Sequence, residues 1–201
     1  MKAFVTGSTR GFGLVLAKEF KQAGYEIVLN GRGCPNFNVK DEFCQNSVMT
    51  FTGKTFDEYK PTVIVNNAFD KSNCLTSFVG QIKVLQAAIE YFGNNGGGII
   101  INVNSSKGLV PDIDYPEYAA AKYGLRGYSE SVKFQCYTKG IHILDLYPGA
   151  INVGMSAYRN DVDKVMDAKE LSQFIVKMCD TKTFVVSTIH FNRKHLAGDV
   201  K

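Results

Sequence analysis

The sequence predicts an α/β fold, a doubly wound parallel β-sheet flanked by helices, in a single domain over residues 1–201. Short runs of mainly β-branched apolar residues recur along the chain, as expected for strands that are buried on both faces. Segments with helical periodicity alternate with these runs, which is the order of a parallel sheet with right-handed crossovers. The length also suits one domain, because single domains commonly hold about 50 to 250 residues.

The apolar runs predict six strands, at 3–5, 27–29, 63–65, 99–103, 141–146 and 184–189. Four helices are predicted between them, at 12–23, 75–92, 116–138 and 168–179, the last of them capped near Asp167. The segment 34–60 is weakly patterned. There we expect a short helix at 38–45, a strand at 47–51 and one helical turn that closes at 57–59 before Pro61.

The composition is that of an ordinary globular protein, with 45% hydrophobic and 21% charged residues. The formal net charge of +4 is mild and the basic residues are spread along the chain, so neither nucleic acid nor a membrane is an expected partner. No apolar run approaches the roughly 20 residues that span a bilayer. The five cysteines are odd in number and widely scattered, which predicts reduced thiols and a cytoplasmic protein.

A glycine-rich turn follows the first predicted strand and opens the first predicted helix. It consists of Thr6, Gly7, Ser8, Thr9, Arg10, Gly11, Phe12 and Gly13. In a Rossmann-type sheet such a turn lets the backbone approach a pyrophosphate, which the free N–H groups and the positive dipole end of the helix bind. Many strand-to-helix turns contain glycine without any ligand, but the strand–loop–helix context favours a dinucleotide site here.

The end of the second predicted strand bears on the choice of dinucleotide. Sheets that bind NAD usually carry an acidic residue there for the ribose hydroxyls, whereas this strand ends Leu29-Asn30-Gly31-Arg32. Arg10 and Arg32 can bracket a 2′-phosphate, so NADP(H) is expected in preference to NAD(H). The alternative is that both arginines are solvated surface residues.

Tyr118 and Lys122 are four residues apart on a predicted helix, so their side chains share one face. An ammonium beside a phenol favours the phenolate and should lower the pKa of the tyrosine, which can then exchange a proton with a substrate. Such pairs are common on helices and prove little alone. Ser105 follows the strand 99–103 at the edge where the glycine turn lies, and can hold a substrate oxygen or only make a local turn bond.

Taken in order, these motifs resemble the short-chain dehydrogenase/reductase family over nearly the whole chain. The resemblance implies an NADP(H)-dependent oxidoreductase that acts on a carbonyl or alcohol group of a small-molecule substrate, with Tyr118 as acid/base and with Ser105 and Lys122 assisting it. It also implies a homo-oligomer, a dimer or tetramer formed through the helices at 75–92 and 116–138. Further residues that the resemblance places beside the cofactor are Asn66, Asn67, Ala68, Tyr118, Lys122, Pro148, Gly149 and Ile151.

The chain also departs from the family pattern, beginning with its unusually short length. Phe69 stands where the family has glycine, Ser77 where it often has an asparagine that holds a water in a proton relay, and Val153 where it usually has threonine. These departures favour the alternative of a non-catalytic NADP(H)-binding sensor or interaction protein on the same fold. Retention of the serine, tyrosine and lysine together favours the enzyme.

Two further possibilities are disfavoured by the sequence. A sugar-nucleotide epimerase or dehydratase of the related extended family needs a larger C-terminal region than the residues that follow Pro148. A metal site is not expected, because His142, His190 and His195 do not form a cluster with cysteines or carboxylates along the sequence.

Overall fold

The computed structural model describes residues 1–31, 42–44, 47–153, 165–181 and 185–191. Within these residues one sheet of seven strands runs in the order β3-β2-β1-β4-β5-β6-β7, and every neighbouring pair is parallel. The predicted α/β architecture with a parallel sheet is confirmed. The strands are β1 (Lys2–Val5), β2 (Glu26–Asn30), β3 (Glu42–Cys44), β4 (Val63–Asn66), β5 (Gly98–Val103), β6 (Ile141–Tyr147) and β7 (Thr188–His190).

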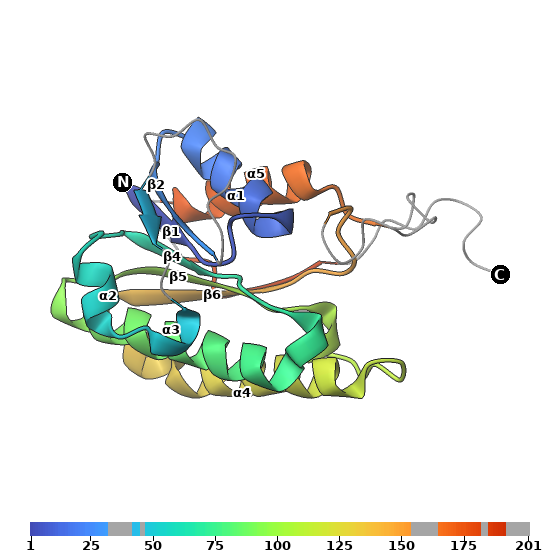
Figure 1. Ribbon diagram of the computed structural model, residues 1–201. Coiled ribbons are helices and arrows are strands. Elements are labelled where there is room, and N and C mark those ends of the chain that lie inside the picture. Colours follow the sequence, from blue (N-terminus) through green and yellow to red (C-terminus); the bar gives the residue numbers. More distant parts are fainter. Residues whose placement is uncertain (32–41, 45–46, 154–164, 182–184, 192–201) are drawn as a thin grey trace.

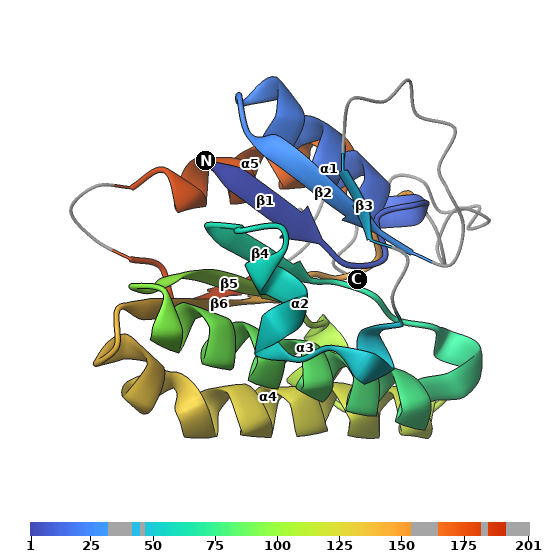
Figure 2. The same cartoon turned by 60° about the vertical axis from the view of Figure 1, so that its left-hand side comes forward.

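Helices cover both faces of this sheet (Figure 1). On one face lie α1 (Gly11–Gln22) and α5 (Ala168–Cys179), and on the other lie α3 (Cys74–Asn94) and α4 (Pro116–Tyr137). The short helix α2 (Gly53–Asp57) packs beside α3, as the turned view in Figure 2 shows. The four long helices agree with the predicted segments to within two residues. Asp167 caps α5 as predicted, because its Oδ1 accepts a hydrogen bond of 2.8 Å from the backbone N–H of Glu170.

The sheet separates two apolar cores, and β1 contributes to both. Ala3 and Val5 pack toward α1 and α5, whereas Phe4 packs toward α2 and α3, as the alternation of side chains along a strand requires. The Phe4 ring lies edge-on to Phe56 at a centroid distance of 5.0 Å and to Phe51 at 5.8 Å. Burial on both faces explains why the strands read as unbroken apolar runs in the sequence.

The weakly patterned segment differs from its prediction. Residues 42–44, expected in a short helix, form strand β3, which pairs with β2 and thereby satisfies backbone groups that an edge would leave unpaired. Residues 47–51, expected as a strand, contain a 3-10 helix over Val48–Thr50. The reason is local, because the Ser47 hydroxyl accepts from the N–H of Met49 while the Thr50 hydroxyl donates to the Ser47 carbonyl.

The last predicted strand is also shorter than expected. Only Thr188–His190 pair with β6, whereas residues 185–187 are not in a strand and residue 184 lies outside the described residues. A short apolar run fixes the existence of a strand better than it fixes its ends. The helical turn predicted to close near Tyr59 is found slightly earlier, as α2.

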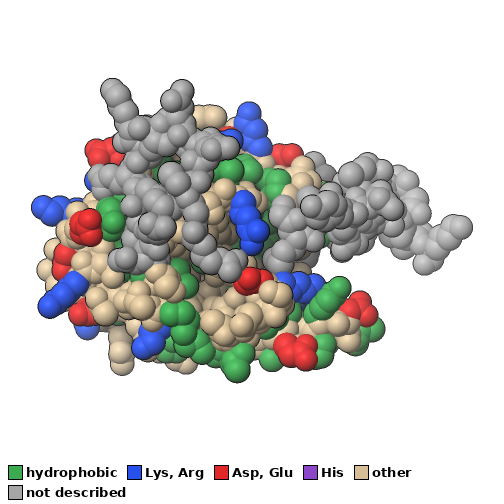
Figure 3. Space-filling model, in the orientation of Figure 1, with side chains coloured by type: hydrophobic (Ala, Val, Ile, Leu, Met, Phe, Trp, Pro, Cys, Tyr) green, Lys and Arg blue, Asp and Glu red, His purple; other side chains and the backbone are tan. Residues whose placement is uncertain are grey.

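The surface seen in Figure 3 mixes basic and acidic side chains without a broad area of one sign. None of the helices within the described ranges is both long and apolar enough to cross a membrane. Large apolar side chains are exposed on α3 and α4, among them Leu75, Phe134 and Tyr137. Assembly of copies through these two helices stays a prediction, as does the cellular location.

Candidate functional site

The site lies where the order of strands reverses, between β1 and β4. The chain leaves β1 toward α1 on one face and leaves β4 toward α3 on the other, so the carboxyl ends of these strands border a crevice. Thr6, directly after β1, connects the two sides of this crevice through its side-chain hydroxyl. Its hydroxyl donates to the Val65 carbonyl at 3.0 Å and accepts from the N–H groups of Asn67 at 2.9 Å and Ala68 at 3.0 Å.

The glycine turn takes a conformation that other residues would strain. Gly7 has a φ of 63° and Gly11 a φ of 58°, both in the left-handed region. A Cβ on Gly13 would overlap the Gly7 carbonyl and the side-chain amide of Asn67. The Asn67 amide also donates to the Thr6 carbonyl at 3.0 Å. A Cβ on Gly7 would come within 2.8 Å of the Ala68 Cα, so the turn packs tightly against the segment after β4.

The first turn of α1 fits a bound pyrophosphate. Arg10 occupies the N-cap position without a side-chain hydrogen bond to the helix, and no acidic residue lies in the first turn. The N–H groups there are thus not satisfied by a cap, and the helix dipole is not opposed by a carboxylate. Phe12 is expected at the cofactor, and its partly buried side chain packs against the core beneath α1.

The end of β2 is joined to the glycine turn by hydrogen bonds between Ser8 and Asn30, including a longer one of 3.4 Å from the Ser8 hydroxyl to the Asn30 carbonyl. The Ser8 N–H donates to the Asn30 carbonyl, and the Asn30 N–H donates to the Ser8 hydroxyl, each at 2.9 Å. A Cβ on Gly31 would overlap the Thr9 side chain, so Gly31 lies directly against the turn. Arg10, which belongs to the glycine turn, is exposed. Arg32, the second predicted arginine, lies outside the described residues.

Ser105, Tyr118 and Lys122 come together past the end of β5. Ser105 is buried, and its hydroxyl accepts from the N–H of Lys107 at 3.1 Å and lies close enough to the Tyr118 phenol to lower its pKa. Tyr118 and Lys122 share one face of α4, with the Lys122 Nζ 5.9 Å from the Tyr118 ring centroid. Pro148 is held nearby, because its carbonyl accepts from the N–H of Ser106 at 2.8 Å.

The pKa of Tyr118 moves in the direction opposite to the one expected. Burial raises it, and the neighbouring Ser105 hydroxyl lowers it by less. Burial also lowers the pKa of Lys122 to about 7, because water is removed from the ammonium. A lysine that is only partly charged near neutral pH cannot draw the phenol toward phenolate as an exposed ammonium would. The prediction of a lowered tyrosine pKa is therefore wrong for this structure.

Phe69, the departure from glycine, is part of the site. Its ring meets the Tyr118 ring edge-on at a centroid distance of 5.4 Å, and the Lys122 Nζ lies 4.2 Å from its centroid. Its φ is not positive, so the backbone there accepts a side chain without strain. The sequence marks this position only as an anomaly and gives no indication that the ring covers the lysine.

Ser77, at the position of the family's relay asparagine, has a local role. Its hydroxyl accepts from the N–H of Asp70 at 2.8 Å and donates to the Asp70 carbonyl at 3.1 Å. Both bonds fix the segment between β4 and α3. Val153 is half-buried, and Ile151 forms an isolated bridge with Met166 and packs against the core beneath α5.

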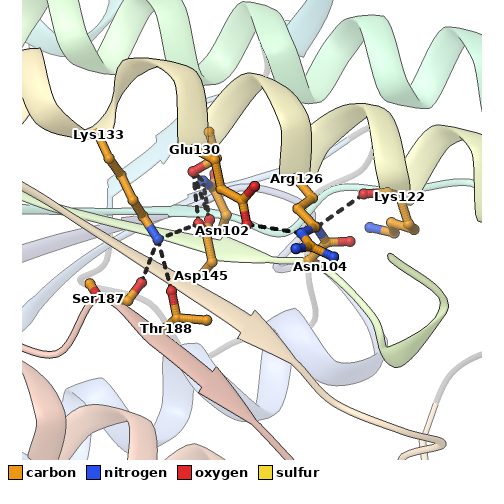
Figure 4. Close-up of polar contacts among 10 residues, drawn as sticks. Asn102, Asn104, Lys122, Arg126, Glu130, Lys133, Asp145, Ser187 and Thr188 are labelled. Atoms are coloured by element: carbon orange, nitrogen blue, oxygen red, sulfur yellow. Dashed lines mark hydrogen bonds and ion pairs between the residues drawn. The ribbon is translucent and has the colours of Figure 1, made fainter. Parts of the chain in front are cut away.

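Sequence reasoning missed a buried polar chain beneath α4, part of which Figure 4 shows. Asp145 in β6 accepts from Asn102 Nδ2 at 2.8 Å and from the Lys133 Nζ at 2.7 Å. Asn102 in turn accepts from Asn66 Nδ2 at 3.0 Å. One signal was present in the sequence, since Asn102 and Asp145 each interrupt a run of buried aliphatic residues.

The two histidines within the described residues pack against tyrosines away from the site. His142 packs against Tyr137, His190 packs against Tyr147, and His195 lies outside the described residues. Across the described ranges, no three histidine, cysteine or carboxylate side chains come together in a way that could hold a metal ion.

Comparison with known proteins places this arrangement among dehydrogenases. The family described as short chain dehydrogenase matches residues 64–164. D-beta-hydroxybutyrate dehydrogenase of Rhizobium meliloti is 27% identical over 236 aligned residues, covering 98% of this chain and 91% of the relative. Acetoacetyl-CoA reductase of Cupriavidus necator is 26% identical over 201 residues, covering 82% of this chain and 80% of the relative.

Solved structures share the fold at lower identity. A short chain dehydrogenase from Burkholderia cenocepacia in complex with NADP superposes with a TM-score of 0.81 at 18% identity, over 96% of this chain and 90% of the other. A gluconate 5-dehydrogenase from the same species, in complex with NADP and tartrate, gives a TM-score of 0.80 at 21% identity over 95% and 93%.

Replacing Gly13 by alanine should destabilise the protein by about 1–3 kcal/mol, because the Gly7 carbonyl must move to admit the methyl group. The matched control is Gly127→Ala on α4, where a Cβ meets nothing within 4 Å and alanine favours the helix by about 0.5–1 kcal/mol. Urea unfolding of both variants measures the difference. Equal stabilities would show that the turn is not tightly packed.

Stability should rise with pH between about 7 and 8.5 because of Lys122. Its folded pKa of about 7 lies below its unfolded value near 10.4, so in this window the unfolded chain binds more protons, and raising the pH removes that advantage. Cys74, Cys136 and Cys179 have raised pKa values and act in the opposite sense at higher pH, which sets the upper limit of the window.

Urea unfolding at a series of pH values measures this slope. The variant Lys122→Met has a side chain of similar length without the charge. Its free energy of unfolding should therefore increase less steeply with pH than that of the wild type. The same slope in both proteins would contradict a buried lysine with a lowered pKa.

Proposed function

This chain belongs to the short-chain dehydrogenase family, and on that premise we propose that it is an NADP(H)-dependent oxidoreductase that interconverts a carbonyl and an alcohol on a small molecule. The observation that carries the proposal is the convergence of Ser105, Tyr118 and Lys122 beside the glycine turn. A protein that only bound the dinucleotide would not need a hydroxyl, a phenol and an ammonium together. The reductive direction is proposed as the main one.

Tyr118 is the proposed acid in reduction. Burial raises its pKa, so the phenol holds its proton at neutral pH and can give it to a carbonyl oxygen as that oxygen gains charge. Ser105, which lies beside the phenol, can donate to the same oxygen and orient it. A bound reduced nicotinamide supplies the hydride for the carbonyl carbon. In oxidation the tyrosine receives the proton of the alcohol.

The binding residues are proposed from the family resemblance together with the position of the glycine turn. The N–H groups of the glycine turn and of the first turn of α1 hold the pyrophosphate, and Asn66, Asn67 and Ala68 border the adenosine side. Lys122 holds the nicotinamide ribose, and Pro148, Gly149 and the Ile151 backbone lie beside the nicotinamide. Arg10 and Arg32 bind the 2′-phosphate that distinguishes NADP(H) from NAD(H).

Tyr118→Phe should lower turnover at least about 100-fold, the usual loss on removing a positioned acid, while NADPH binding is preserved. Tyr123→Phe is the control, since Tyr123 lies on the same helix and is 40% exposed. A panel of ketones, aldehydes and quinones with NADPH, followed by the absorbance of the reduced nicotinamide, measures turnover. Activity of the Tyr118→Phe variant near that of the wild type would overturn the assignment.

Arg10→Gln should weaken NADPH binding about 10- to 100-fold, as expected for loss of a charged hydrogen bond, and should leave NADH binding nearly unchanged. Arg126→Gln serves as the control, because Arg126 pairs with Glu130 on the surface of α4 at 2.9 Å. Calorimetric titration with both dinucleotides measures the ratio. An equal loss for NADH and NADPH would assign Arg10 to the pyrophosphate rather than to the 2′-phosphate.

The alternative of a non-catalytic NADP(H)-binding sensor or interaction protein rests on the short length and on Phe69, Ser77 and Val153, which differ from the usual residues of the family. A wild-type protein that binds NADPH tightly but reduces no member of the carbonyl panel would favour the sensor over the enzyme.

A further inference from the structure

Gln81, in the first half of α3, touches the lysine of the site. Its side chain is 1% exposed, and its Oε1 accepts a hydrogen bond of 3.2 Å from the Lys122 Nζ. At the other end of the amide, Nε2 donates to the Asn66 carbonyl at 3.5 Å, and the Gln81 carbonyl accepts from Asn66 Nδ2 at 2.9 Å. The amide is thus held in one orientation, with its oxygen toward the lysine.

The Lys122 ammonium has three N–H donors, and two of them bond to oxygen. One meets Gln81 Oε1 and the other meets the Val103 carbonyl at 3.1 Å. Both acceptors are buried and come from elements that flank α4, so they set the direction of the ammonium rather than follow it. Phe69 covers a further side with its ring, 4.2 Å from Nζ. Of the two oxygens, only that of Gln81 belongs to a side chain.

Gln81 stands one helical turn after Ser77, the position at which the family often has its relay asparagine. Residues four apart share a helix face, so both point toward the same region of the crevice. The Ser77 hydroxyl is committed to the backbone of Asp70. The longer Gln81 side chain contacts the lysine directly. An amide has no proton to give up at neutral pH, so this contact can hold the lysine but cannot carry protons away from it.

We infer that Gln81 is a positioning residue for the proposed reaction, whose side-chain carbonyl aims the Lys122 ammonium and stabilises its charged form. The catalytic importance of Lys122 in this inference rests on the proposed function, whereas the hydrogen bond between Gln81 and Lys122 is observed in the structure. An oxygen acceptor at an ammonium favours the protonated state, whereas burial favours the neutral amine. Gln81 therefore opposes the effect of burial at the one cation that the proposed mechanism needs.

The other ionisable groups around the lysine are few. Among the described residues, Cys74 at the start of α3 and Tyr118 on α4 face it, and Lys71 lies beyond them, with Nζ 5.5 Å from the Tyr118 ring centroid. Cys74 has a raised pKa and is a neutral thiol near pH 7. No carboxylate in the described structure forms an ion pair with Lys122, so its charge depends on the carbonyl oxygens.

The test is a titration of the protein without dinucleotide, with lysine side chains labelled with 13C at Cε and the Lys122 signal assigned by its loss in Lys122→Met. Gln81→Leu keeps the volume and removes the acceptor, so the Lys122 midpoint should fall by about one pH unit or more. Gln81→Glu restores an acceptor and adds a negative charge, so the midpoint should rise above that of the wild type. Opposite shifts of one signal are not expected from a merely structural role.

Gln86→Leu is the matched control, since Gln86 is exposed on the same helix, and it should leave the midpoint unchanged. With NADPH and an accepted carbonyl, Gln81→Leu should lower kcat/KM about 10- to 100-fold, with partial recovery in Gln81→Glu. An unchanged midpoint in Gln81→Leu overturns the inference, as does wild-type kcat/KM in that variant. If Gln81→Leu does not fold, the shift in Gln81→Glu alone decides.

The two failures are distinguishable. A wild-type protein without turnover contradicts the proposed function, while the Lys122 midpoint still reports whether Gln81 stabilises the ammonium.

Discussion

The buried carboxylate of Asp145 is the constraint on which the α3/α4 side of the molecule depends (Figure 4). It is 1% exposed in the middle of β6, where an unpaired charge would cost several kcal/mol. Ser129 and Lys133 on α4 and Asn102 on β5 all donate to it, at 2.7 to 2.9 Å. Because a carboxylate only accepts, the amide of Asn102 must turn its nitrogen toward Asp145 and its oxygen toward β4.

A chain of hydrogen bonds connects this oriented amide of Asn102 to the site. The Asn102 oxygen accepts from Asn66, which also donates to the carbonyl of Gln81 and so fixes α3 against β4. Gln81 then reaches Lys122, while Asn104 donates to the Lys122 carbonyl at 3.2 Å and fixes α4 against β5. The two long helices are thereby set in one register. Their alignment places the tyrosine and lysine of α4 over the serine that follows β5.

The sequence predicts the structure best at positions where only one residue type satisfies the local geometry. Glycine at positions 7 and 13 is demanded by backbone conformation and close approach, so the turn is recognisable from the order of its residues alone. The regular helices and strands are predicted equally well, because their apolar residues recur with the period of the element. The segment 47–51 departs from its prediction because two hydroxyl–backbone bonds outweigh its apolar character. Gln81 could not be found from the sequence at all, because its importance lies in a contact made across 41 residues of chain.

Burial also reverses what the tyrosine–lysine spacing implies on its own. In water an ammonium would lower the pKa of a neighbouring phenol, but here desolvation raises the pKa of Tyr118 and lowers that of Lys122, so each favours its neutral form. A neutral phenol is a proton donor, which suits the reduction of a carbonyl better than the reverse reaction. The oxygens of Gln81 and Val103 oppose this loss of charge on the lysine, and an anionic ligand in the crevice would oppose it further. Proton donation and ligand binding are therefore coupled. The same apolar surroundings that keep the proton on Tyr118 also favour the neutral form of Lys122, which is the residue proposed to hold the ligand.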